Sequence, residues 1–481
     1  MSLAVSRWKP RPGRLTVRLA WLHRWLGIAT CLILAAWFAS GAVLLFKPFP
    51  SLSRGDQLAL SAPIDLASVR LSPAEALARA GEGAVTAMRL VQRGTAPAYI
   101  VDAGGKFAAV DARTGDRLAP LASGAVAASS PPIDYDQWIV HNRFDPYRPI
   151  YRIQLGDPAR TTLYRSAVTG EPVQRTTAEE RAWNWIGAVL HWVYFTPLRS
   201  SFTAWDRTVW IVSLIATVVA ILGIVLGIIR TRTALRQRKP SLSFYRPKWM
   251  RWHHLLGLFT GVFVFTWILS GWLSMDHGRL FSRGQPTDEQ SAAYRGRPLA
   301  AALAEIDSAT LRSIGPASEI DFNVAGGMPI LTAYRADGRA DRMDGRGETL
   351  ADATFARLVG SGIQRSWPGA QARSIAAVAG TDLYAHAEGW PASVKRVSLG
   401  GQGFPDIYID GDTGRILTVM SDSRASYAWI YYALHTFEFP GLIERPLLRQ
   451  ILVLVPLLFG FLFSLTGVVI GWTRLRKSIS N

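Results

Sequence analysis

Two apolar stretches, each beginning close to a histidine, are long enough to cross a membrane as helices. Residues 21–45 read WLHRWLGIATCLILAAWFASGAVLL, and residues 251–275 read RWHHLLGLFTGVFVFTWILSGWLSM. A bilayer core of about 30 Å requires about 20 consecutive apolar residues in an α-helix. A shift of 230 positions places His23 on His253. The same helical pattern therefore occurs twice. An ionisable side chain near the end of a membrane helix is by default a functional-site hypothesis.

A second pattern, a Leu-His segment followed by another apolar stretch, is also repeated. Leu190-His191 corresponds to Leu434-His435. A spacing of 244 positions then relates two sets of glycines and arginines: Gly223, Gly227, Arg230 and Arg232 in the first copy, and Gly467, Gly471, Arg474 and Arg476 in the second. We therefore expect a tandem duplication. Parallel repeats of this kind usually pack around a pseudo-two-fold axis along the membrane normal, with the functional site between them.

The expected fold class is a membrane α+β protein with four transmembrane helices and two folded inserts. Hydropathy places the spans at about 18–46, 205–230, 252–275 and 448–472. The expected organisation is an arm and first span (1–46), a first α+β domain (47–181), an interfacial helix and second span (182–230), a basic loop (231–251), a third span (252–275), a second α+β domain (276–426), an interfacial helix and fourth span (427–472), and a tail (473–481).

The charge distribution predicts the orientation of the chain in the membrane. The formal net charge is +18, and basic residues without any Asp or Glu flank the first span, fill the middle loop and follow the last span. Positively charged flanks stay on the cytoplasmic side, so both termini and the middle loop are expected there and both inserts outside. No basic patch alternates with aromatic residues in a folded segment, so we expect contact with membrane lipid and none with nucleic acid.

The cysteine count and the motifs limit the chemistry. Cys31 is the only cysteine, which leaves no disulfide, no thiolate iron–sulfur site and no CxxCH attachment of haem. Any haem must therefore be held without covalent links, as a b-type group. The GxGxxG, Walker and HExxH motifs are also absent, so the sequence carries no recognisable nicotinamide, flavin or nucleotide site and no zincin centre.

The inserts carry short helix and strand patterns. Ser72-Pro73 with Glu75 reads as an N-cap followed by proline at the first helical position. Strands are expected in the first insert at 88–92, 98–102 and 107–111 and again within 150–172, and in the second insert at 394–399 and 406–410, with another helix and two or three strands within 299–350. Each insert then ends in an aromatic helix of interfacial character, at 183–195 and 427–439.

Histidines are the candidate site residues. Five of the eight stand near span ends in duplicated motifs: His23, His191, His253, His254 and His435. A hydrogen-bonded histidine in an aromatic belt is the simpler explanation of any one of them, and the repetition weakens it. Neutral imidazole is a usual axial ligand of haem iron, and two opposite imidazoles suit electron transfer. The sequence leaves open which histidines pair, leaves open the choice between His253 and His254, and keeps His277 as a reserve candidate.

The motifs together resemble a known family. HRWLG at 23–27, HHLLG at 253–257, the two Leu-His segments and the PepSY-like helix-then-strands inserts are similar to the PepSY-associated transmembrane (PepSY-TM) family, whose members include inner-membrane ferric-siderophore reductases of bacteria. The resemblance implies two b-type haems, periplasmic inserts, and an oxidoreductase that passes electrons outward to ferric siderophore and releases ferrous iron. The electron donor is expected to be a cytoplasmic flavoprotein or membrane quinol.

Two other classes of function stay open. A non-catalytic PepSY membrane protein that restrains or senses a periplasmic peptidase would tolerate replacement of the membrane histidines. An importer of an iron chelate is less favoured, because Pro456 is the only proline in the middle of a span and no charged residue lies at mid-membrane. On the reductase hypothesis, Arg199 and Arg445 together with Tyr or Trp side chains are expected to hold an anionic or aromatic chelate at the outer surface.

Overall fold

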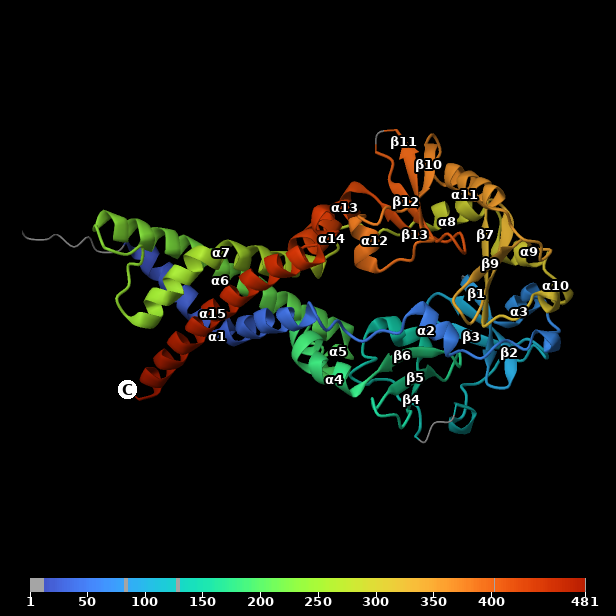
Figure 1. Ribbon diagram of the computed structural model, residues 1–481, viewed down its shortest axis with the longest axis horizontal. Coiled ribbons are helices and arrows are strands. Elements are labelled where there is room, and N and C mark those ends of the chain that lie inside the picture. The colour runs from blue at the N-terminus through green and yellow to red at the C-terminus, as the bar shows by residue number, and fades with distance from the viewer. Residues whose placement is uncertain (1–12, 82–84, 127–129, 402, 481) are drawn as a thin grey trace, which may run out of the picture.

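The computed structural model describes residues 13–81, 85–126, 130–401 and 403–480. The molecule is elongated, with a bundle of long helices at one end and all the sheets at the other (Figure 1). We call the end of the bundle next to the sheets the insert side, and the opposite end, where the C-terminus lies, the terminus side. The basic residues expected in the N-terminal arm, Arg7, Lys9 and Arg11, lie outside the described residues.

Four helices are long and apolar enough to cross a membrane. They are α1 (Arg14–Leu44), α6 (Phe202–Arg236), α7 (Lys248–Ser274) and α15 (Pro446–Ile479). All four predicted spans are confirmed, although most of the helices extend beyond them. Hydropathy marks only the part that lipid can cover, whereas backbone hydrogen bonds continue a helix into water at polar residues such as Arg232 and Arg476.

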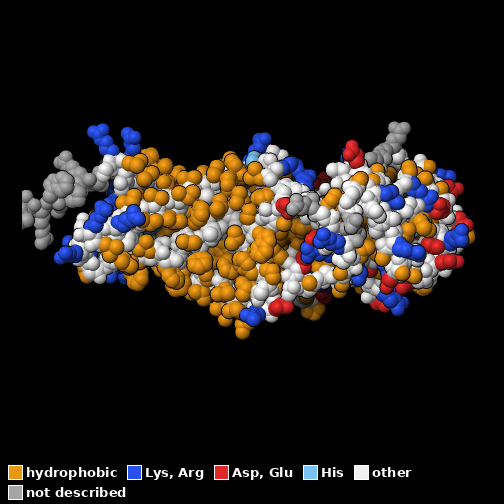
Figure 2. Space-filling view, turned by 90° about the horizontal axis from the view of Figure 1, so that it is seen from above, with side chains coloured by type: hydrophobic (Ala, Val, Ile, Leu, Met, Phe, Trp, Pro, Cys, Tyr) orange, Lys and Arg blue, Asp and Glu red, His pale blue; other side chains and the backbone are white. Residues whose placement is uncertain are grey.

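The four helices pack around a common apolar core. α1 contacts α15 and α6, and α7 contacts the same two helices. Phe38 and Trp267 lie in this core with ring centroids 6.2 Å apart. Gly460 allows Phe38 to pack closely against α15, because a Cβ built on this glycine would lie 2.6 Å from the Phe38 ring. The outside of the bundle is a belt of apolar side chains bordered by Lys and Arg on the terminus side (Figure 2), the surface pattern of a protein embedded in lipid.

The first insert begins with helices and continues with strands. Its elements are α2 (Arg54–Ala59), η1 (Leu66–Ser68), α3 (Pro73–Arg79), β1 (Val85–Arg93), β2 (Ala96–Ala103), β3 (Phe107–Asp111), η2 (Ser123–Val126), η3 (Asn142–Tyr147), β4 (Ile150–Gln154), β5 (Thr162–Ser166) and β6 (Pro172–Thr176). The predicted cap is confirmed: the Ser72 hydroxyl accepts the Glu75 N–H, and the Glu75 carboxylate accepts the Ser72 N–H at 2.7 Å. The strands predicted in this insert are also present.

The second insert repeats the mixture of helices and strands. It contains α8 (Asp288–Arg295), α9 (Leu299–Leu303), α10 (Ser308–Ser313), β7 (Glu319–Ala325), β8 (Met328–Tyr334), β9 (Ala340–Met343), α11 (Asp352–Ser366), β10 (Gln371–Ala377), α12 (Leu383–Glu388), β11 (Lys395–Gly400), β12 (Asp406–Ile409) and β13 (Ile416–Met420). The strands predicted at 394–399 and 406–410 correspond to β11 and β12.

Strands of the two inserts meet in one sheet. The order β3-β2-β1-β7-β8-β9 is continuous, because β1 pairs antiparallel with β7 and places Met88 opposite Phe322. One face of this sheet buries a core that includes Leu90, Tyr99 and Ile320 against the short helices. Two smaller sheets, β4-β5-β6 and β10-β11-β12-β13, belong to one insert each. The two inserts are therefore joined by backbone hydrogen bonds as well as by side chains.

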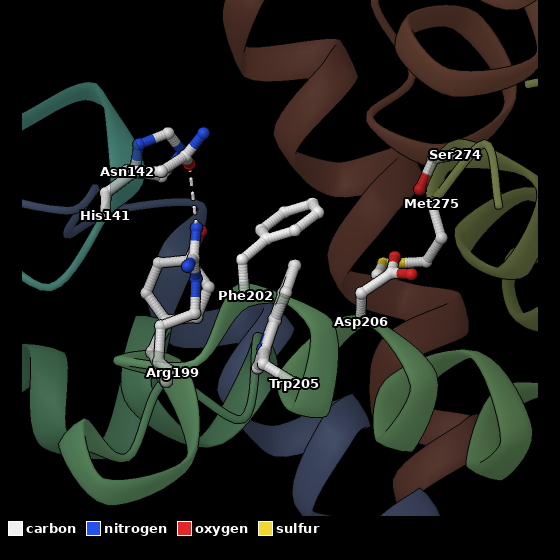
Figure 3. Close-up of a pocket in the computed structure, with 9 residues that line it drawn as sticks. His141, Asn142, Arg199, Phe202, Trp205, Asp206, Ser274 and Met275 are labelled. Atoms are coloured by element: carbon white, nitrogen blue, oxygen red, sulfur yellow. Dashed lines mark hydrogen bonds between the residues drawn. The ribbon is translucent and has the colours of Figure 1, made fainter. Parts of the chain in front are cut away.

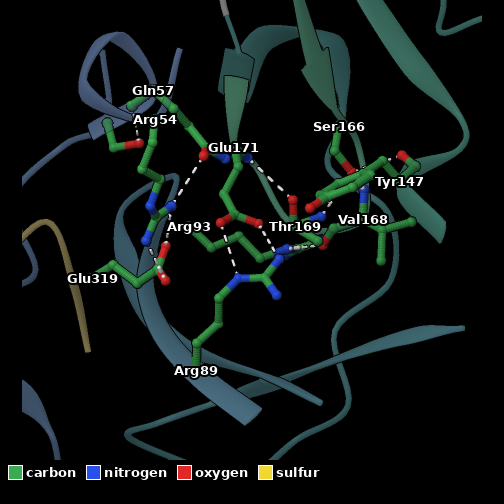
Figure 4. A network of polar contacts seen from close by, with 11 residues as sticks. Arg54, Gln57, Arg89, Arg93, Tyr147, Ser166, Val168, Thr169, Glu171 and Glu319 are labelled. Atoms are coloured by element: carbon green, nitrogen blue, oxygen red, sulfur yellow. Dashed lines mark hydrogen bonds and ion pairs between the residues drawn. The ribbon is translucent and has the colours of Figure 1, made fainter. Parts of the chain in front are cut away.

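Two ion pairs reinforce the packing around the shared sheet, one within the first insert and one between the inserts (Figure 4). Arg89 of β1 pairs with Glu171, which precedes β6, at 2.7 Å, and Arg54 of α2 pairs with Glu319 of β7 at the same distance. Both carboxylate side chains are almost completely buried, at 5% and 7% exposed. Although burial alone would raise the pKa of Glu171, the Arg89 guanidinium holds that pKa below its usual value. The network ties the three-stranded sheet and α2 to the shared sheet.

Each insert returns to the bundle through a short helical segment. α4 (Ala178–Asn184) continues as the π-helical turn η4 (Trp185–Val189), and α13 (Asp422–Ala428) continues as η5 (Trp429–His435). These helices begin earlier and end sooner than the predicted ones. They end because Val193 and Phe437, 244 positions apart, have φ of 54° and 58°, a left-handed conformation in which a helix cannot continue. The short helices α5 (Thr196–Arg199) and α14 (Pro440–Ile443) then lead into α6 and α15.

Candidate functional site: two histidine pairs in the helix bundle

The first pair of histidines lies toward the terminus side of the bundle. His23 is in the third turn of α1, and His253 is in the second turn of α7. Their ring centroids are 6.4 Å apart and their planes are inclined at 47°. The His253 ring also stacks on Phe463 of α15 at 4.5 Å. Two helices from different halves of the sequence thus place their first histidines next to each other.

The second pair lies toward the insert side. His191 follows η4 and His435 ends η5, and their ring centroids are 6.1 Å apart. η4 packs on α1, and η5 packs on α7. His191 contacts Ser40 of α1, seventeen positions beyond His23, which corresponds to about 25 Å along a helix that rises 1.5 Å per residue. The two pairs therefore occupy opposite ends of one bundle.

Hydrogen bonds fix the tautomer of two of the four rings through carbonyl oxygens, which only accept. Nδ1 of His23 lies 3.1 Å from the carbonyl oxygen of Val219, so Nδ1 donates. Nδ1 of His435 lies 3.2 Å from the carbonyl oxygen of Trp267 and 3.1 Å from the Ser270 hydroxyl. A neutral imidazole that donates from Nδ1 has its lone pair on Nε2. Both rings therefore present an unprotonated Nε2.

Hydroxyl groups fix the other two rings in the same way. The Ser40 hydroxyl donates to the Trp37 carbonyl oxygen and lies 3.1 Å from Nδ1 of His191. The Thr466 hydroxyl donates to the Phe463 carbonyl oxygen and lies 2.9 Å from Nδ1 of His253. Because each hydroxyl proton is already used, each hydroxyl accepts the imidazole N–H. All four rings thus have Nδ1 engaged and Nε2 free of any hydrogen bond within the described residues.

A glycine packs against the edge of each of the four rings. A Cβ built on Gly223 would lie 3.0 Å from Cε1 of His23, and one built on Gly271 would lie 3.1 Å from Cε1 of His435. The corresponding distances are 3.4 Å from Gly41 to His191 and 3.7 Å from Gly467 to His253. These glycines stand on the helices that supply or adjoin the hydrogen-bond acceptors. They leave the imidazoles room in an otherwise closely packed bundle.

His254 has no ring nitrogen available for a ligand. Its Nε2 lies 3.1 Å from the carbonyl oxygen of Gly227 and therefore donates, while its Nδ1 lies 3.2 Å from the Ser243 hydroxyl. The side chain is 7% exposed and ties α7 to the end of α6 and the loop that follows. The reserve candidate His277 lies outside both pairs: its Nδ1 pairs with Asp206 at 2.7 Å, and its ring lies 4.9 Å from that of Trp210.

The spacing of each pair is suited to two imidazoles that bind one haem iron from opposite sides. A metal–imidazole bond is about 2 Å long and a ring nitrogen lies about 1 Å from the ring centre, so the centroids of two such imidazoles are about 6 Å apart. The observed 6.4 Å and 6.1 Å match this value. No group of three or more His, Cys, Asp or Glu side chains suited to a metal ion occurs in the described ranges. Each pair thus offers two nitrogens to a metal whose other ligands come from elsewhere, as a porphyrin supplies them.

The residues that orient the imidazoles were not identified as site residues from the sequence. Ser40-Gly41 and Ser270-Gly271 are 230 positions apart, so the two serines stand out in the sequence only as part of the repeat. Thr466 has no counterpart at the equivalent place in the first copy. Gly223 and Gly467 were recognised as repeat positions without a role. The repeat was therefore the one available signal, because equivalent positions beside equivalent histidines indicate equivalent environments.

The bundle, the two histidine pairs and the sheet-containing inserts define a multi-pass membrane protein of mixed α and β structure. A family model described as the PepSY-associated TM region matches residues 20–474. The chain therefore belongs to the PepSY-associated transmembrane family, as its motifs predicted. A search of curated proteins finds no significant match to the chain.

Proposed function

We propose that this protein is a b-type haem oxidoreductase of the bacterial inner membrane that carries electrons outward and reduces ferric siderophore in the periplasm. The observation that carries the proposal is the presence of two histidine pairs at opposite ends of one bundle, with centroid separations of 6.4 Å and 6.1 Å and with every Nε2 free. One hydrogen bond from each ring would be enough for a purely structural role, so the close pairing of these half-buried rings supports a role as ligands.

Each pair holds one haem in this proposal. His23 and His253 bind the inner haem, and His191 and His435 bind the outer one, so His253 is the ligand of the doublet and His254 supports the helix contact. When bound between two imidazoles, a b-type haem exchanges single electrons. The Nδ1 hydrogen bonds fix each ring orientation and increase the basicity of Nε2, as outer-shell partners of metal ligands generally do.

The orientation and the duplication belong to the same proposal. The basic ends of the bundle face the cytoplasm, and the inserts lie in the periplasm. Equivalent contacts in the two halves support an origin by tandem duplication: Ser40 with His191 and Ser270 with His435 are both at 3.1 Å. A cytoplasmic flavoprotein or membrane quinol would supply the electrons, since the sequence has no nucleotide-binding motif of its own.

The reaction needs one electron for each ferric ion. The oxygen donors of a siderophore hold hard ferric iron much more tightly than softer ferrous iron, so reduction releases the metal without breaking a covalent bond of the chelator. A two-electron donor such as a reduced flavin or a quinol therefore serves two ferric ions. The outer pair, next to the inserts, is the place where the electron leaves the bundle.

Haem content and reoxidation test the proposal. The purified protein should contain close to two b-type haems per chain by pyridine haemochrome analysis, and His23→Ala, His191→Ala, His253→Ala and His435→Ala should each lower the content by about one. Reduced protein mixed with a ferric hydroxamate siderophore should be reoxidised while a ferrous chelator traps iron. A colourless protein from haem-replete cells would instead favour a PepSY protein that restrains a peptidase. Reoxidation by quinone or oxygen alone would remove the siderophore from the assignment.

A further inference from the structure

A cavity of about 200 Å³ lies on the insert side of the bundle (Figure 3). Ser274, one of its lining residues, follows Ser270 by about one turn of α7, and Ser270 contacts His435. Tyr194, another lining residue, is three positions after His191. The cavity and the outer pair are therefore built from the same segments at the same end of the bundle.

Arg199 is the central charge of this cavity. Its side chain is 2% exposed, and its guanidinium lies 4.5 Å to 5.3 Å from the ring centroids of Tyr194, Phe202 and Trp205. Its Nη2 donates to Oδ1 of Asn142 at 3.0 Å, while its Nε is buried and has no hydrogen-bond partner. A buried cation with an unused donor is costly unless an anion completes the site.

The protein supplies no such anion within the part of the chain that the structure describes. Asp206 also lines the cavity, but its Oδ2 pairs with Nδ1 of His277 at 2.7 Å. Elsewhere at this end of the bundle, Arg449 pairs with Glu438 at 3.0 Å. Arg199, by contrast, has no carboxylate partner among the residues that the structure describes.

The surroundings add a second donor and further positive potential. Nδ1 of His141 accepts the Arg143 N–H at 2.9 Å, which leaves the proton of the neutral ring on Nε2. Burial and the positive charges of Arg199 and Arg143 lower the pKa of His141 to about 4, so the ring is neutral at physiological pH. An anion in the cavity therefore meets one buried cation, a neutral imidazole and aromatic rings, together with the Asp206 carboxylate, which pairs with His277.

The size of the cavity selects the class of ligand. Pockets for drug-sized ligands have volumes of about 300–1,000 Å³. A volume of about 200 Å³ is too small to enclose an intact ferric siderophore. It fits a single carboxylate on a flexible arm.

We propose that Arg199, together with Asn142 and His141, binds a propionate carboxylate of the outer haem. The inference rests on the proposed function, because it requires a haem between His191 and His435. The planar, bidentate guanidinium is suited to a carboxylate, and burial away from water strengthens the contact. Arg199 is then a positioning residue that fixes the rotation of the haem within its plane and adds a positive charge beside it.

Reconstitution with an esterified haem tests the inference without any change to Arg199. The His23→Ala chain, which keeps only the outer site, is produced in haem-depleted cells and loaded with haem or with haem dimethyl ester, whose propionates carry no charge. The outer site should release the ester at least ten-fold faster than haem. Arg199→Gln should abolish this preference and shift the midpoint potential of the outer haem downward, because a nearby cation favours the electron-rich state. Arg207→Gln, which changes an exposed arginine of α6, should change neither quantity.

Three results would overturn the inference, and they differ from failure of the proposed function. Equal release of haem and its ester by the His23→Ala chain would show that no carboxylate is bound, while haem binding itself would stand. An unchanged preference in a folded Arg199→Gln chain would place the carboxylate elsewhere. Loss of a co-purified phospholipid from that variant, with the preference intact, would make a lipid phosphate the ligand. Absence of haem from the unmodified protein would instead remove the proposed function.

Discussion

The hydroxyl oxygen of Ser40 lies 3.1 Å from Nδ1 of His191. Since the serine proton is donated to the Trp37 carbonyl, the hydroxyl accepts the imidazole N–H and leaves the Nε2 lone pair for a metal. One small side chain on α1 thus determines which nitrogen of a histidine 151 positions away keeps a free lone pair. The orientation of the rings in the candidate cofactor sites therefore depends on contacts between helices and not on the histidines alone.

Removal of this hydroxyl should loosen the outer haem. Ser40→Ala leaves Nδ1 of His191 without its acceptor, and loss of an outer-shell partner typically lowers metal affinity by about 10- to 100-fold. We expect the outer haem to dissociate at least ten-fold faster, as measured by transfer to apomyoglobin, while the inner haem is unaffected. Ser464→Ala is the matched control, because that buried hydroxyl donates only to the carbonyl of Gly460 in its own helix. Equal dissociation rates in the two variants would contradict the role of Ser40.

The two adjacent histidines of α7 should respond differently to substitution. His253→Ala removes a free Nε2 and should reduce haem content from two to one per chain. His254→Ala should retain two haems, because both nitrogens of His254 are hydrogen-bonded to the chain. It should nevertheless destabilise the protein by about 1–3 kcal/mol, since it leaves the Ser243 hydroxyl and the Gly227 carbonyl oxygen without their partner. Haem stoichiometry and thermal unfolding in detergent together separate the two roles, and a reversed stoichiometry would exchange them.

The sequence predicted five candidate histidines but not how they are held. Repetition placed His23 and His253, and likewise His191 and His435, at corresponding positions, and it left their pairing open. The partners of Nδ1 lie 151 to 213 positions away on other helices, where no local pattern connects them. The choice between His253 and His254 depends on a rotation of about 100° around one helix, which packing against α15 decides.

In the inserts, too, the sequence predicted local elements but not the contacts between distant ones. Alternation and turn residues predicted individual strands such as β2 and β12 correctly, because those patterns are local. The pairing of β1 with β7 joins residues more than 220 positions apart, and the local sequence of neither strand indicates that the other lies beside it. The left-handed Val193 was also unpredictable, since a β-branched residue adopts that conformation only where the surrounding structure imposes it.

Gly271 should be required for haem binding but not for folding. A Cβ at this position would lie 3.1 Å from Cε1 of His435, so Gly271→Ala must displace the ring by a few tenths of an ångström. Alanine is otherwise favoured over glycine in a helix by up to about 1 kcal/mol. We expect unchanged or slightly higher thermal stability together with several-fold faster loss of the outer haem. Gly261→Ala on the same helix is the control, because its Cβ would meet Ile224 at an ordinary 3.5 Å.

The ion pair between Arg89 and Glu171 should make the contact between the three-stranded sheet and the shared sheet sensitive to acid. The pKa of Glu171 is lowered in the folded protein, where the Arg89 charge outweighs the effect of burial. A carboxylate of this kind stabilises the fold above its unfolded pKa of about 4.3, and this contribution is lost as pH falls through the lower folded pKa. Glu171→Gln leaves Arg89 buried without a charge partner and should cost about 3–5 kcal/mol at pH 7.

The difference between Glu171→Gln and the unmodified protein should therefore be largest at neutral pH and shrink below about pH 4.3. Hydrogen exchange of the backbone amides in β1 and β6, compared at pH 7 and at pH 3.5 after correction for the intrinsic exchange rate, measures it. Glu179→Gln is the control, since Glu179 pairs with Lys47 but is 68% exposed, and such a pair is screened by water. A destabilisation by Glu171→Gln that is the same at both pH values would show that the buried carboxylate acts through packing or neutral hydrogen bonds and not through its charge.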